Sequence, residues 1–135
     1  MSPSFSSFRR FSLCLCIAAL VSGCEVNSNG TAIADPPHCT LTSLSELSPA
    51  KPGAFATMRA VVTSDGEGTA YNVVLKVKLK RGNLIVGQDF AAFTSLERGE
   101  AIGYDLVFTG VQSASDYDKV ETSLIWQDYD GGVYP

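Results

Sequence analysis

Histidine and catalytic motifs are scarce in this sequence. Its 135 residues contain one histidine, His38, and four cysteines. It has no Gly-x-Ser-x-Gly nucleophile turn and no glycine-rich phosphate loop. Catalysis requires a nucleophile with a base, a tuned pair of carboxylates or a metal, and His38 beside Cys39 supplies too few ligands for zinc. We therefore expect neither an enzyme nor a bound cofactor.

A hydrophobic run long enough to cross a membrane is also lacking near the start of the chain. The apolar stretch Phe11–Val21 has eleven residues and no charge. A helix of that length rises roughly 16 Å, whereas the hydrocarbon core of a bilayer is about 30 Å thick. Because Arg9 and Arg10 precede the stretch and small residues follow it, the pattern is typical of a cleaved secretory signal.

The residues after this stretch, Leu20–Cys24, read LVSGC and resemble the lipobox of bacterial lipoproteins. The resemblance implies cleavage between Gly23 and Cys24, acyl chains such as palmitate on Cys24, and a membrane-anchored place in the cell envelope. In lipoprotein families that sort by the residue after this cysteine, aspartate favours the inner membrane, so the resemblance implies that Glu25 favours the outer membrane. Two alternatives stay open, namely an ordinary secretory signal with Cys24 incidental and an N-terminus that is not cleaved.

The chain is expected to comprise a signal peptide (1–23), a lipidated cysteine with a flexible tether (24–37) and one folded domain (38–135). The tether is small and polar and ends in two prolines. Removal of the signal leaves 112 residues, with eight basic against fourteen acidic ones, so the net charge changes from −4 to −6. An acidic chain argues against nucleic acid as a partner.

A disulfide within the domain is excluded by the same processing. Cys14 and Cys16 would leave with the signal and Cys24 would carry lipid, so Cys39 remains alone. We interpret Cys39 as a small buried residue on a first strand, with intermolecular pairing or reactivity as the alternative. His38 is expected at the surface or at a strand end.

The rest of the sequence shows an alternation of period two, which predicts strands. Val73, Leu75, Val77 and Leu79 alternate with Val74, Lys76, Lys78 and Lys80. Further strands are expected at 38–44, 55–63, 84–94, 101–108, 119–127 and 133–134, with a kink at Gly87 and Trp126 in the core. Glycine-rich turns separate them. Seven strands at this spacing predict a single immunoglobulin-like antiparallel β-sandwich.

Part of this pattern resembles a known family. Gly68–Leu79 reads GTAYNVVLKVKL, with a small residue, then Asn-Val, then an alternating strand, and Leu96–Glu100 reads LERGE before the next strand. Over Phe55–Phe108 the chain thereby resembles FxLYD-type domains, which are small immunoglobulin-like modules of bacterial and archaeal surface proteins. The resemblance implies a sandwich and no catalytic residues.

Acidic loops suggest one alternative function. In an immunoglobulin-like topology the loops that hold Asp65, Glu67, Asp128 and Asp130 meet at one end of the sandwich. Their carboxylates could therefore bind calcium or a small ligand, although the ordered ligand spacing of a known calcium loop is absent. Ordinary solvated turns are the competing interpretation.

Interaction surfaces are the remaining candidates. The basic strand face of Lys76, Lys78 and Lys80 either protects a sheet edge from aggregation or docks an acidic partner or polymer. Five aromatic residues are expected in loops or at strand ends, where tyrosine often marks an interface: Phe90, Phe93, Tyr117, Tyr129 and Tyr134. The short last strand either frays or leaves an edge open to an added strand.

Together these features predict a lipid-anchored protein of the bacterial cell envelope that acts as a non-enzymatic interaction or structural module. Its expected partners are the membrane, reached through the lipid, and another envelope protein.

Overall fold

The computed structural model describes residues 36–135 and contains seven strands and one short 3₁₀ turn. The strands are β1 (Cys39–Leu44), β2 (Ala56–Ser64), β3 (Ala70–Arg81), β4 (Leu84–Leu96), β5 (Ala101–Phe108), β6 (Lys119–Gln127) and β7 (Val133–Tyr134). The 3₁₀ turn, Ala114–Asp116, precedes β6. Each strand coincides within a few residues with a segment that the sequence predicts, and the long strands β2 and β3 bury one face by alternation.

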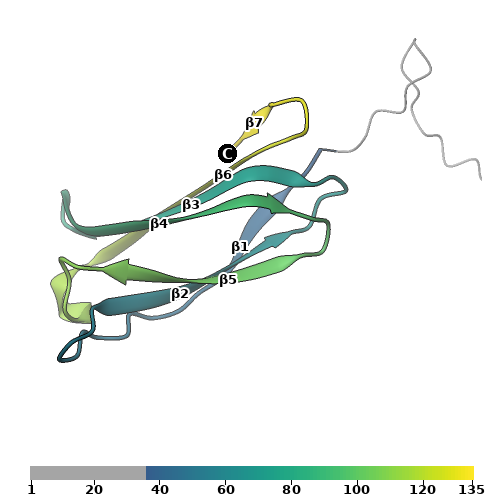
Figure 1. The fold of residues 1–135 in the computed structure, drawn as a ribbon. Coiled ribbons are helices and arrows are strands. Elements are labelled where there is room, and N and C mark those ends of the chain that lie inside the picture. Colours follow the sequence, from purple (N-terminus) through teal and green to yellow (C-terminus); the bar gives the residue numbers. More distant parts are fainter. Residues whose placement is uncertain (1–35) are drawn as a thin grey trace, which may run out of the picture. The chain divides into compact units, whose positions relative to one another are not determined.

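Two antiparallel sheets form a sandwich (Figure 1). One sheet has the order β1-β2-β5 and the other β4-β3-β6-β7. The expected immunoglobulin-like sandwich of about seven strands is thereby confirmed. Unlike the constant-type arrangement, in which the fourth strand joins the first and second, β4 forms a hairpin with β3 and lies in the four-stranded sheet.

The core lies between the sheets and is dominated by the inward row of β3. Val73, Leu75, Val77 and Leu79 are fully buried. They pack with inward residues of both sheets, among them Met58, Val62, Leu106, Phe108 and Trp126. Trp126 and Cys39 are buried as expected. Burial raises the pKa of the Cys39 thiol to about 11, so this thiol is protonated at neutral pH.

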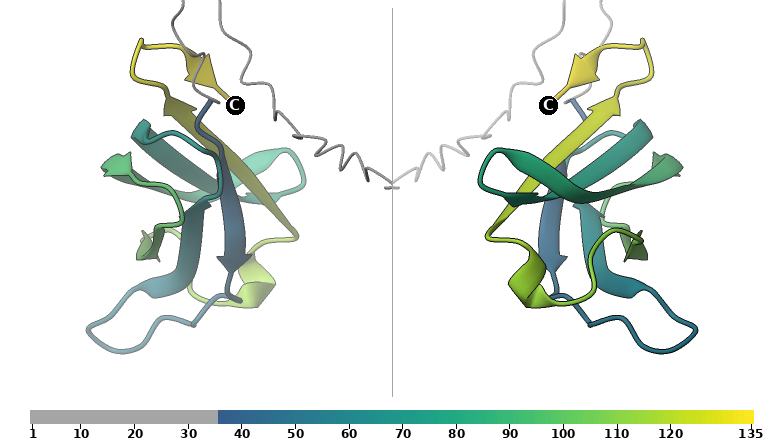
Figure 2. Two further views of the ribbon diagram at one scale, coloured as in Figure 1. Left: turned by 90° about the vertical axis from the view of Figure 1, so that its right-hand side faces the viewer. Right: turned by 90° about the vertical axis from the view of Figure 1, so that its left-hand side faces the viewer.

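The chain enters the domain at the end that also holds the β2–β3, β4–β5 and β6–β7 turns (Figures 1 and 2). Asp65 N–H and Gly66 N–H donate to the carbonyl of His38. A Cβ on Gly66 would lie 2.2 Å from the backbone nitrogen of His38, so only glycine permits this approach. Pro37, the last residue of the expected tether, is buried and accepts a hydrogen bond from Trp126 Nε1 at 3.0 Å. The fold therefore extends to Pro37.

Two details of the sequence interpretation need correction. Phe90 and Phe93 lie within β4, and not in a loop or at a strand end. The lysine-bearing strand β3 pairs with both β4 and β6, so its lysines do not protect a sheet edge. The irregularity expected at Gly87 is a bulge, because Leu79 pairs with Gly87 but Lys80 pairs with Ile85, which leaves Val86 unpaired.

The inward row of β3 provides a stability test. Replacing Leu75 with alanine removes a fully buried side chain from the middle of the core and should lower the free energy of unfolding by about 2–5 kcal/mol. Leu84→Ala is the matched control, because Leu84 is 68% exposed and its loss should change stability little. Urea unfolding measures both, and equal effects would contradict the assigned core.

Candidate interaction surfaces

The outer face of the four-stranded sheet gathers residues that lie far apart in the sequence. Because residues directly opposite each other in a ladder share a face, the outward lysines of β3 adjoin outward residues of both neighbouring strands. Lys76 pairs with Phe90 and Ser123, Lys78 with Gln88 and Glu121, and Lys80 with Lys119. We call this surface, formed by the outward side chains of β4, β3 and β6, the lysine face.

Charge on the lysine face is unlike that of the remaining domain. Four lysines (76, 78, 80 and 119) and one glutamate, Glu121, occupy it. The other residues of the described range carry four basic and eleven acidic side chains. The face therefore has a formal charge of +3 on a domain that is otherwise −7. Such segregation creates a local positive potential that attracts acidic groups.

Glu121 binds two of the four lysines and leaves two unpaired. Its Oε1 lies 3.1 Å from Lys80 Nζ and 2.8 Å from Lys119 Nζ. Hydrogen bonds from Lys119 and Lys80 lower the pKa of Glu121 from 4.5 to about 2. Within residues 36–135, no carboxylate lies at ion-pair distance from Lys76 or Lys78. These two ammonium groups are free to bind an external anion.

Apolar groups accompany the unpaired lysines. Phe90 is 59% exposed on β4 and Ile125 is 41% exposed on β6, and both are outward residues. A hollow of about 240 Å³ on the same face is lined by Lys76, Lys78, Glu121, Thr122 and Ser123. A surface that offers both positive charge and exposed apolar area suits an acidic protein better than a purely ionic ligand.

Two of the three tyrosines predicted for an interface, Tyr129 and Tyr134, lie elsewhere, at the end where the chain enters. Tyr134 stacks on Trp126 with a ring separation of 6.1 Å, and its hydroxyl donates to Asp128 Oδ2 at 2.8 Å. This hydrogen bond lowers the pKa of Asp128 and raises that of Tyr134. Tyr129 is 87% exposed and contacts Tyr71 edge-on. The structure therefore does not join the tyrosines to the lysines in one surface.

The four acidic residues proposed for calcium also lie at this end, but each has its own environment. Asp65 accepts a hydrogen bond from His38, which lowers the pKa of the Asp65 carboxyl. Glu67 pairs with Arg98, Asp128 binds Tyr134, and Asp130 is exposed in the last turn. In the part of the chain that the structure describes, no three His, Cys, Asp or Glu side chains could hold one metal ion. Calcium binding stays a prediction.

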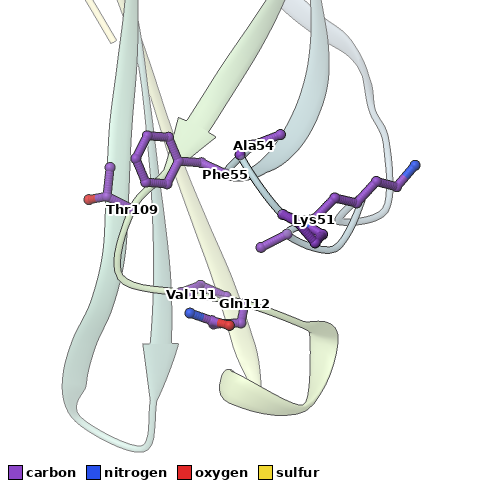
Figure 3. Close-up of a pocket in the computed structure, with 9 residues that line it drawn as sticks. Lys51, Ala54, Phe55, Thr109, Val111 and Gln112 are labelled. Carbon is purple, nitrogen blue, oxygen red and sulfur yellow. The ribbon is translucent and has the colours of Figure 1, made fainter.

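A hollow of about 560 Å³ lies at the opposite end of the sandwich (Figure 3). It lies between the tight turn Lys51–Ala54 and the Thr109–Gln112 segment, which are joined by a hydrogen bond from Ala50 N–H to the carbonyl of Gln112. The ring of Phe55, which is 60% exposed, lies beside Thr109. The Lys51 side chain extends away from both of them. Sequence reasoning gave no signal for this hollow.

Comparisons with protein-family models, curated proteins and solved structures find no match to this chain. No helix among residues 36–135 is long and apolar enough to cross a membrane. Gly23, Cys24 and the rest of the expected signal and tether up to residue 35 lie outside the described residues.

The ion pairs of Glu121 should make stability depend on acidity in a defined range. Because the pKa of Glu121 is lowered in the folded state, its contribution is complete above about pH 4.5 and is lost as the pH falls towards 2. Glu121→Gln should therefore flatten the decline of stability across this range.

Urea unfolding at several pH values measures this effect. Glu46→Gln is the control, since Glu46 makes no ion pair within the described residues. A Glu121→Gln protein whose stability declines as steeply as that of the unmodified protein would contradict the assignment.

Proposed function

We propose that this chain is a lipid-anchored, non-enzymatic interaction module of the bacterial cell envelope, which binds another envelope protein through the lysine face. The observation that carries the proposal is the charge segregation on a small β-sandwich. Lys76 and Lys78 are unpaired beside exposed Phe90 and Ile125, on a domain whose remaining surface is acidic. The partner would present carboxylates together with apolar groups.

The sequence pattern around Cys24 supports the lipid anchor in this proposal. Stable attachment to a bilayer needs more than one acyl chain, and lipoproteins normally carry three on the modified cysteine. The chain enters the domain at the Pro37–His38 end, whereas the lysine face lies along the length of the four-stranded sheet. The tether therefore joins the domain at a place outside the lysine face.

Lipidation is tested directly by replacing Cys24. Cys24→Ser should abolish incorporation of labelled palmitate and remove the protein from the membrane fraction, because serine lacks the thiol that carries the lipid. Cys39→Ser is the matched control, since Cys39 is buried in β1 and should keep the label. Unchanged membrane attachment of Cys24→Ser would refute the lipoprotein assignment.

The lysine face is tested by reversing one unpaired charge. Lys76→Glu should reduce capture of the envelope partner by the lipidated protein by about tenfold or more, because a like charge then faces the acidic groups of the partner. Lys51→Glu makes the same change in charge outside the face and should leave capture intact.

Quantitative mass spectrometry of proteins captured from solubilised envelopes gives the comparison. Equal losses for Lys76→Glu and Lys51→Glu would show that net charge matters and the face does not, which contradicts the proposed surface.

A further inference from the structure

One edge of the four-stranded sheet is only partly covered. β7 pairs with β6 opposite Trp126 and Gln127 alone. From Lys119 to Ile125, β6 pairs with β3 on one side and has no strand partner on the other within residues 36–135. In an antiparallel strand every second residue directs its amide and carbonyl to the same side. The uncovered part of β6 therefore presents a row of unpaired backbone groups.

Two of the other edge strands, β1 and β4, carry features that discourage pairing. β1 has a register shift between Leu41 and Ser43, and β4 has the bulge at Val86. Asp89 of β4 reaches across the open side of the sandwich, and its Oδ2 accepts a hydrogen bond from Val107 N–H of β5 at 2.7 Å. Bulges and inward-pointing charges are the usual protection of sheet edges.

The segment of β6 from Lys119 to Ile125 lacks both features. Its ladder with β3 is regular over this range, because the shift in that pairing lies nearer the end of β6. Its two charged residues, Lys119 and Glu121, lie at the start and bind each other. Thr122–Ile125 are uncharged. This edge is therefore more open to an added strand than the β1 and β4 edges.

Partly buried apolar residues of β1 and β6 lie on the same side of the molecule. Leu41 and Leu44 of β1 and Val120 and Leu124 of β6 pack against the core without being fully covered. β1 and β6 belong to opposite sheets but contact each other along this side (Figure 2). A strand added beside β6 would direct alternate side chains towards these residues and bury more of their surface.

We propose that the β6 edge, Lys119–Ile125, accepts an extended segment of the partner as an additional strand, with apolar and acidic residues alternating along it. Backbone hydrogen bonds to β6 provide the pairing. The apolar side chains cover Leu124 and its neighbours, and the acidic ones lie on the outer surface beside β6, next to Lys119 and one strand away from the unpaired Lys76 and Lys78. This inference rests on the proposed function and specifies how the partner binds.

Amide hydrogen exchange of the full-length lipidated protein in detergent micelles tests the inference. The probe is a synthetic peptide of alternating valine and glutamate, long enough to span Lys119–Ile125. The peptide should slow exchange by about tenfold or more at those amides of this segment that point away from β3, towards the open edge. The same peptide with a central proline should not, because proline removes a donor. Unchanged exchange in β6, or protection at the β4 edge instead, would overturn the inference.

Two neighbouring proline substitutions give a second, independent test. Thr122 and Ser123 direct their amides to opposite sides of β6, so only one of Thr122→Pro and Ser123→Pro removes a hydrogen bond to β3. That variant should show a much lower melting temperature. The other should keep its melting temperature close to that of the unmodified protein and lose protection by the peptide. Full protection in the stable variant would overturn strand addition.

Failure of this inference is separable from failure of the proposed function. If the peptide protects no part of β6 while Lys76→Glu still abolishes capture of the partner, strand addition is wrong and the lysine face stands. If the peptide protects β6 while Lys76→Glu leaves capture unchanged, the edge binds a strand and the lysine face is not the partner's site.

Discussion

The alternation of side chains along β3 is the constraint on which the other features of this domain depend. Its inward residues Val73, Leu75, Val77 and Leu79 are fully buried. Since a shift of one residue would move the whole apolar row to solvent, burial fixes the register with β4 and β6. The same register places Lys76, Lys78 and Lys80 outward together. The alternation and register of β3 therefore determine both the core and the lysine face.

Burial has to hold this fold without a covalent link. Cys39 is the one cysteine among residues 36–135, and it is buried as a free thiol. The entry of the chain is fixed by small, close contacts instead, where Gly66 admits the backbone of His38 and Trp126 binds the carbonyl of Pro37. These contacts join the start of β1 to the ends of β2 and β6. The first residues of the domain are thus tied to both sheets.

The local alternation of apolar and polar residues was sufficient to predict the strands, but it did not predict the surfaces that the paired strands form. Alternation and glycine turns located all seven strands, because each strand carries its own signal. That Phe90, Glu121 and Ser123 adjoin the lysines depends on strand pairing between distant segments, which composition does not reveal. Phe90 and Phe93 were misplaced because core packing did not obviously claim their side chains, whereas both lie within β4. The acidic residues share one end as the topology implies, yet their partners His38, Arg98 and Tyr134 could not be read from spacing.

The lysine face and the uncovered edge of β6 are adjacent, so one partner can use both. Ser123 lies on the boundary between them, whereas Val107 lies outward on β5 in the opposite sheet. Photo-crosslinking of the full-length protein in intact cells, with a photoreactive residue in place of either one, tests this account most directly. We predict protein adducts from position 123 that an acidic, apolar-alternating peptide suppresses, and none from position 107. Equal adducts from both positions, or adducts at 123 that the peptide leaves unchanged, would contradict it.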